Sequence, residues 1–169
     1  MVTACYYNGN LARSFFFLPI RNINSKDQKI TELKTQFATL KEDCESQNLR
    51  FADIQARLDF INAPSTEKYL LEGNSKAANF QTIAYWNDSS QKSMLQILGL
   101  PDLPEKHCLQ MWADVDGVMI NLGVIKSEQT TLPIDWKFLA NAESLNVTIE
   151  SEGGSEHPTV SNLVASISI

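Results

Sequence analysis

Apolar residues between Ile30 and Ile61 recur alternately three and four positions apart. Over about four heptads this spacing keeps an apolar seam on one side of an α-helix, which is typical of a left-handed coiled coil. A helix of roughly 37 residues would be about 55 Å long, and a small β domain is narrower than that. We therefore expect two chains to pair as a parallel homodimer. The predicted dimer interface consists of Ile30, Leu33, Phe37, Leu40, Cys44, Gln47, Phe51, Ile54, Leu58 and Ile61.

Two positions of this seam are not large apolar residues. Gln47 faces the partner in the expected dimer, where a polar side chain costs stability but helps to fix the register. Cys44 is interpreted as a small apolar filler at a core position, although its thiol can cross-link two chains in an oxidising compartment. A second structure that fits the same pattern is an amphipathic helix packed partly on its own β domain.

The helix is predicted to span residues 25–62. Ser25 begins a sequence that resembles a capping box, with Gln three residues later. Pro64 disfavours helical dihedrals in the residue before it and ends the helix. Residues 1–24 are interpreted as an irregular, membrane-proximal leader. Their apolar run is interrupted by an arginine and a proline and is shorter than the roughly 20 residues of a membrane-spanning helix.

After Pro64 the helical period ends, and β-branched or aromatic residues gather in short runs between turn-forming residues. Asp116 and Gly117 supply the positive backbone dihedrals of a tight turn between two of these runs. The fold class is mainly β: an antiparallel β-sandwich of about eight strands over residues 66–169, preceded by a long N-terminal coiled-coil helix. The expected strands lie at 68–72, 80–86, 93–98, 109–113, 118–125, 130–134, 144–150 and 163–169.

Charge and cysteine content argue against several partners and cofactors. The formal net charge is −6, whereas a surface that follows nucleic-acid phosphates needs clustered Lys and Arg. We therefore expect no nucleic-acid partner. Cys5, Cys44 and Cys108 lie far apart in a chain with two histidines, so the ligand spacing of zinc sites is not met.

The residues form no recognisable catalytic set, and we expect no enzymatic activity, no cofactor and no metal. No Ser or Cys has a neighbouring motif that activates a nucleophile, and Asp114 and Asp116 are more simply explained as turn residues. A blue-copper site needs two His, a Cys and a distant Met. His107 and Cys108 are neighbours on an expected strand, so they point to opposite faces and cannot bind one ion.

Three stretches carry a resemblance to a known family. They are the aromatic pair Tyr85-Trp86, a Leu-Gly-Leu-Pro-x-Leu-Pro stretch at 98–104 followed by Leu-Gln-Met-Trp at 109–112, and a late Val-Thr-Ile-Glu-Ser-Glu-Gly-Gly-Ser-Glu-His-Pro-Thr stretch at 147–159. In order and spacing they resemble the C-terminal domain of the RskA-like anti-sigma-K factor family, over roughly residues 66–169. The preceding helix is similar to the linker of that family.

The resemblance implies a regulatory domain on the periplasmic, extracytoplasmic side of the bacterial inner membrane, within a single-pass membrane protein. It implies that the whole protein holds an extracytoplasmic-function sigma factor inactive and so represses transcription. The sigma-binding domain of the family, often with a zinc motif, has no counterpart in this sequence. We therefore expect a sigma factor to be bound only through a cytoplasmic domain outside this chain.

An alternative function is that of a cell-surface β-sandwich that binds a glycan or a peptide. Trp136 follows Pro133 in an expected loop, where its ring is a candidate for exposure. Exposed aromatic residues with a polar rim mark binding patches. A binding face in this alternative would contain Trp136 or Tyr85.

Overall fold

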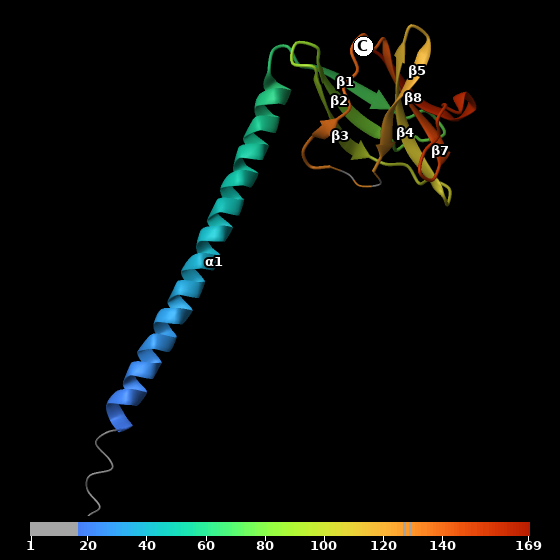
Figure 1. Cartoon of the computed structure of the whole chain (residues 1–169). Coiled ribbons are helices and arrows are strands. Elements are labelled where there is room, and N and C mark those ends of the chain that lie inside the picture. The colour runs from blue at the N-terminus through green and yellow to red at the C-terminus, as the bar shows by residue number, and fades with distance from the viewer. Residues whose placement is uncertain (1–16, 127, 129) are drawn as a thin grey trace, which may run out of the picture. The chain divides into compact units, whose positions relative to one another are not determined.

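The computed structural model describes the backbone of residues 17–126, 128 and 130–169, and side chains from Ser25 onward. It divides into a first compact unit that ends at Asp53 and a second that spans Ile54–Ile169. The elements, drawn in Figure 1, are α1 (Phe17–Asn62), β1 (Glu67–Glu72), β2 (Gln81–Asn87), β3 (Lys92–Gly99), β4 (His107–Val115), β5 (Val118–Ile125), β6 (Ile134–Trp136), β7 (Ser144–Ser151), a 3-10 turn (Val160–Asn162) and β8 (Leu163–Ser168).

Helix α1 ends at Asn62, where the sequence predicts it to end, but it begins before Ser25. Residues 17–24 are helical, so the expected irregular leader is wrong for that part, and residues 1–16 lie outside the described residues. Pro19 falls in the first helical turn, where a missing N–H breaks no hydrogen bond. Every residue from Ser25 to Asp53 is exposed.

Eight strands form two four-stranded sheets in the second unit, one in the order β1-β2-β3-β6 and the other in the order β5-β4-β7-β8. All their pairings are antiparallel, which confirms the mainly β, antiparallel prediction. The strand expected at 130–134 is displaced. It runs instead from Ile134 to Trp136, after Pro133, because proline has no N–H to donate to a ladder.

One core lies between the two sheets. Leu95 of β3 is fully buried, and so are Met111 of β4 and Leu145 of β7, all members of a single apolar cluster. The rings of Trp86 and Phe138 extend this cluster, with their centroids 4.9 Å apart. Apolar side chains from both sheets are therefore buried against one another, and burial of this apolar surface is the main source of the domain's stability.

The tight turn between β4 and β5 forms where the sequence predicts it. Asp116 has a φ of 54° and Gly117 a φ of 78°, the positive values of a hairpin turn. At one side of the domain the segment that follows β1 contacts β8. Asn74 donates from its backbone N–H to the carbonyl oxygen of Val164 in β8 (2.7 Å). Its side-chain Nδ2 also donates to the Leu163 carbonyl (2.8 Å).

At the opposite side, β5 is the outermost strand of its sheet. The indole ring of Trp136 in β6 lies against Gly123 of β5, where a Cβ atom would stand 3.6 Å from the ring. Lys137 donates from Nζ to the carbonyl oxygen of Asn121 (2.7 Å). These contacts cover the middle of β5. The last residues of β5 follow the covered part and lie at one end of the domain.

Candidate functional site

The predicted interface residues of α1 form an uncovered apolar row. Phe37, Leu40 and Phe51 are each between 67% and 69% exposed, values that are high for such large apolar side chains. Leu58 falls to 37%, and Ile61 is half-buried. Within the first unit, the structure thus places the expected seam in solvent, where the hydrophobic effect favours its burial against another surface.

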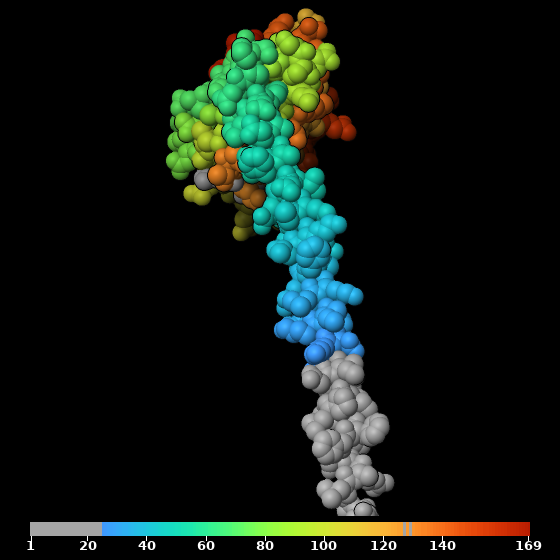
Figure 2. All heavy atoms as spheres, turned by 90° about the vertical axis from the view of Figure 1, so that its left-hand side faces the viewer, coloured from blue at the N-terminus to red at the C-terminus, as the bar shows by residue number. Residues whose placement is uncertain are grey.

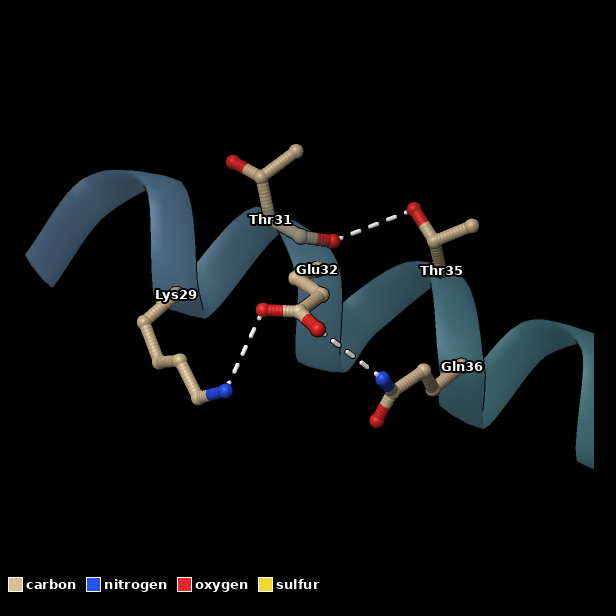
Figure 3. Close-up of polar contacts among 5 residues, drawn as sticks. All are labelled: Lys29, Thr31, Glu32, Thr35 and Gln36. Atoms are coloured by element: carbon tan, nitrogen blue, oxygen red, sulfur yellow. Dashed lines mark hydrogen bonds and ion pairs between the residues drawn. The ribbon is translucent and has the colours of Figure 1, made fainter. Parts of the chain in front are cut away.

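Polar side chains on the flank of α1 bond with one another along the helix. Lys29 pairs with Glu32 (3.2 Å), and Gln36 donates from Nε2 to the same carboxylate (3.2 Å). Thr35 donates its hydroxyl to the Thr31 carbonyl oxygen (3.1 Å), as Figure 3 shows. Contacts three and four residues apart support an isolated helix by a few tenths of a kcal/mol each. They stabilise the helix locally and leave its apolar row without a cover.

The two polar seam positions also lie on the exposed helix. Cys44 is an exposed free thiol, and its sulfur accepts a long contact from Asn48 Nδ2 (3.8 Å). Gln47 is exposed. Both therefore stand where the seam pattern places them, on a surface that the described chain does not bury.

The last turns of α1 are tied to the β1-β2-β3-β6 sheet. Arg57 donates from Nη1 to the Pro133 carbonyl oxygen (2.7 Å) and lies 3.7 Å from Asp135 of β6. All three residues belong to the second unit, which is coloured from teal to red in Figure 2. The side chain of Arg57 is 19% exposed. The hydroxyl of Thr66 donates to the Phe60 carbonyl oxygen (2.7 Å). Two hydrogen bonds thus fix the junction between the helix and the sheet, one from Arg57 to the residue before β6 and one from Thr66 to the last turn of α1.

A second candidate site is a partly enclosed cavity of about 310 Å³ at one end of the β domain. Three segments meet there: the 100–103 stretch before β4, the end of β5, and the loop after β7. Its walls are mainly aliphatic, with polar groups at the rim. The lining residues are Leu100, Pro101, Leu103, His107, Cys108, Leu109, Val124, Ile125, Lys126, Glu152 and Gly153.

A buried carboxylate holds the loop that forms one wall of this cavity. Glu150 of β7 is 3% exposed and accepts four hydrogen bonds. The donors are the hydroxyls of Thr148 (2.6 Å), Ser155 (2.9 Å) and Thr159 (2.8 Å) and the backbone N–H of Thr159 (2.7 Å). Burial alone would raise the pKa of Glu150, but these hydrogen bonds outweigh it and hold the pKa below its ordinary value.

The amide of Gln110 fixes the same loop from the neighbouring strand. Its Oε1 accepts from the Ser155 N–H (2.7 Å), and its Nε2 donates to the Ser155 carbonyl oxygen (3.0 Å). Gly154 passes so close that a Cβ atom would lie 2.7 Å from Gln110 Oε1, and its φ is +87°. A glycine is therefore required at this point. The Glu150 and Gln110 contacts together make the wall a preformed surface.

Trp112 lies beneath this loop. It belongs to the face of β4 that points away from the core, yet it is fully buried. Its Nε1 donates to the Thr148 hydroxyl (2.8 Å), which in turn donates to Glu150. The chain of bonds links an indole, a hydroxyl and a carboxylate.

His107 and Cys108, the residues considered for metal binding, each contact a backbone carbonyl oxygen. His107 Nδ1 lies 2.8 Å from the Glu105 carbonyl oxygen, and Cys108 donates its thiol to the Ser151 carbonyl oxygen (3.1 Å). Among the described residues, no group of three or more His, Cys, Asp or Glu side chains is placed to hold a metal ion. Asp116 forms the predicted turn, and Asp114 precedes it at the end of β4.

The two aromatic residues proposed for the alternative function are buried or half-buried. Tyr85 is 5% exposed and donates its hydroxyl to Gln96 Oε1 (3.0 Å). Trp136 belongs to a strand rather than a loop, is half-buried, and has its Nε1 enclosed without a hydrogen-bond partner. Tyr85 therefore offers no open stacking surface, and Trp136 is partly exposed in a strand rather than exposed in the expected loop.

Sequence reasoning missed Glu150 and Gln110 as loop-holding residues. The loop at 152–158 is expected from its glycines to be mobile, and alternation along β7 places Glu150 on an outer face. A usable signal was present, because four hydroxyl residues and two glycines lie around Glu150 in the late stretch at 147–159, and three of those hydroxyls donate to its carboxylate. Such residues are the short donors and the tight turns that a buried carboxylate needs.

Comparison with known proteins identifies the family. Within the described part of the chain, no helix is both long enough and apolar enough to cross a membrane. No curated protein and no solved structure gives a significant match. The family model described as anti-sigma-K factor rskA, C-terminal, matches residues 28–163, which include most of the helix and nearly the whole β domain. The chain therefore belongs to this family of anti-sigma-factor C-terminal domains.

Proposed function

We propose that this chain is the extracytoplasmic regulatory part of a membrane-bound anti-sigma factor and that it acts as a dimer. The helix over residues 25–62 is the stalk, and residues 66–169 form the domain that receives a signal. The family is one of regulators rather than enzymes. The partner of the complete protein is a sigma factor, bound by a cytoplasmic domain on the other side of the inner membrane.

The exposed apolar row of α1 is the observation that supports the dimer. A single helix that leaves Phe37, Leu40 and Phe51 in water gains no burial from its own sequence. The heptad spacing of these residues fits pairing with a second copy of the same helix. A parallel pair keeps both membrane-proximal ends on one side, as two chains anchored in one membrane require.

Sedimentation equilibrium of the full chain tests the pairing. We expect a dimer mass at micromolar concentration, and Phe37→Asp or Leu40→Asp should yield a monomer because a carboxylate cannot be buried in the seam. Leu49→Asp is the matched control, since Leu49 is 74% exposed on the same helix but lies off the seam. A wild-type monomer, or equal dissociation by Leu49→Asp, would refute the proposed interface.

Cysteine chemistry tests the parallel alignment. In a parallel, in-register dimer the two Cys44 side chains occupy the same level of the seam and face each other. In a Cys5→Ser, Cys108→Ser background, mild oxidation should therefore give a covalent dimer that Cys44→Ser abolishes. A non-covalent dimer that resists cross-linking through Cys44 would contradict the parallel arrangement.

The regulatory role is tested in the bacterium. A chromosomal deletion of residues 66–169 in the complete protein should change transcription from promoters of the cognate sigma factor. The point variant Phe37→Asp should change the same transcription if pairing contributes to control, whereas Leu49→Asp should not. Unchanged sigma-dependent transcription after the deletion would count against the regulatory function.

A further inference from the structure

The end of the β domain holds a cavity that no contact of the proposed dimer uses. Its volume of about 310 Å³ is at the lower end of the roughly 300–1,000 Å³ found for ligand pockets. Leu103, Leu109 and Ile125 contribute to its aliphatic walls. This size suits one or two apolar side chains and is small for a lipid or a large cofactor.

The rim of the cavity carries charges of both signs. Lys126 and Glu152 are both lining residues and both exposed. An anionic head group would meet the carboxylate of Glu152, and a cationic one would meet the ammonium of Lys126. A neutral ligand that both donates and accepts hydrogen bonds fits this rim better than an ion of either sign, and peptide amide groups have this property.

The cavity lies at the end of an edge strand. β5 pairs with β4 on one side, and among the described residues no other strand pairs with it. Contacts from Lys137 and Trp136 cover the strand at Asn121 and Gly123, but Val124 and Ile125 continue past them into the cavity wall. An extended peptide beside an edge strand gains main-chain hydrogen bonds, and an adjacent pocket selects its side chains.

The walls are held in place without a ligand. The loop that carries Glu152 and Gly153 is fixed on one side by Gln110 and on the other by Glu150. The Glu152 N–H also donates to the Lys106 carbonyl oxygen (2.8 Å). A preformed pocket loses little entropy on binding.

We propose that this cavity binds an extended peptide segment, which seats an apolar side chain between the aliphatic walls while its amide groups meet Lys126, Glu152 and the end of β5. The site is separate from the helix seam. Binding there gives the domain a protein partner outside the dimer, and its failure would leave the proposed dimer and regulatory role unaffected.

The probe is the peptide acetyl-Thr-Leu-Thr-Leu-Thr-amide, titrated into the ¹⁵N-labelled full chain and followed by amide NMR shifts. We expect saturable shifts at Leu109, Val124 and Ile125, and none from the polar analogue acetyl-Thr-Ser-Thr-Ser-Thr-amide. Sodium octanoate is the competing amphiphile. The proposal would be overturned if octanoate shifted these amides while the leucine peptide did not, or if the leucine peptide and its polar analogue shifted them equally.

Two valines on β5 give a matched pair of variants. Val124 lines the cavity and is 36% exposed, whereas Val118 is 60% exposed at the other end of the strand. Val124→Asp should weaken binding of the leucine peptide about tenfold or more, and Val118→Asp should leave it unchanged. Both are surface changes, so a retained amide spectrum shows that each variant is folded. Equal affinity in the two variants would contradict a site in the cavity.

Discussion

The helix from Ser25 to Asp53 and the β domain handle their apolar residues in opposite ways. The helix leaves every residue exposed, including the aromatic rings of its seam. The β domain buries its core completely and also covers Trp112 on an outer face with its own loop. The β domain thus buries its apolar residues with contacts from its own chain, whereas burial of the helix seam would require a surface from outside the described chain.

This difference predicts that stability of the two regions responds to different variables. Folding of the β domain should be independent of protein concentration, because its contacts lie within one chain. Helicity over residues 25–53 should rise with concentration if the proposed pairing is correct. The variants below damage the domain or its junction with the helix and ask whether the exposed helix is affected.

The largest effect is expected for Trp112→Ala. Truncation of a fully buried Trp should lower the free energy of unfolding of the β domain by about 3–5 kcal/mol, measured by scanning calorimetry. Trp112→Phe retains most of the volume and loses the bond to Thr148, so it should cost about 1 kcal/mol. If Trp112→Ala also abolished self-association, the two regions would not be independent.

An intermediate effect is expected for Glu150→Gln. Four donors converge on this carboxylate, and loss of its charge should cost the domain about 1–3 kcal/mol at neutral pH. Glu156→Gln, an exposed change in the same loop, is the control and should cost far less. A smaller loss for Glu150→Gln than for the control would show that the bonds do not hold the loop.

The same residue gives the domain a dependence on pH. The pKa of Glu150 is lower in the folded chain than its ordinary value of 4.5, so its contribution to stability is full above 4.5 and is lost as pH falls through the lower folded pKa. Calorimetry of the wild type below pH 4.5 should show this loss. Glu150→Gln should show a flatter profile, and a parallel slope in both proteins would contradict it.

The smallest effect is expected for Arg57→Ala, at the boundary between the two regions. Removal of its bond to the Pro133 carbonyl and its pair with Asp135 should destabilise the domain by about 1 kcal/mol. Arg50→Ala is the matched control, because Arg50 is exposed on the same helix within the first unit. Equal calorimetric profiles for the two variants would show that the helix end is not fixed to β6.

Local chemistry made much of the fold predictable. The positive dihedrals at Asp116 and Gly117 follow from the residue pair itself, and the end of α1 follows from Pro64. Strands with β-branched residues in alternation, such as β7, were placed to within a residue or two. The family resemblance was confirmed by the match over residues 28–163.

What could not be predicted depends on contacts between distant segments. Gln110 lies on the outer face of β4, and its burial comes from hydrogen bonds to Ser155, 45 positions further along the chain. The cavity has the same origin, because three separate segments form it. The aliphatic residues at 100–103 reveal a pocket only when the ends of β5 and β7 are placed beside them.

The three tryptophans of the chain, Trp86, Trp112 and Trp136, all belong to the β domain, and the helix from Ser25 to Asp53 has none. Near-ultraviolet emission therefore reports on the domain alone, while far-ultraviolet dichroism is dominated by the helix. Trp112, with its indole bonded to Thr148, is the fluorophore closest to the loop that Glu150 holds. The molecule thus carries a built-in optical label for one of its two regions and none for the other.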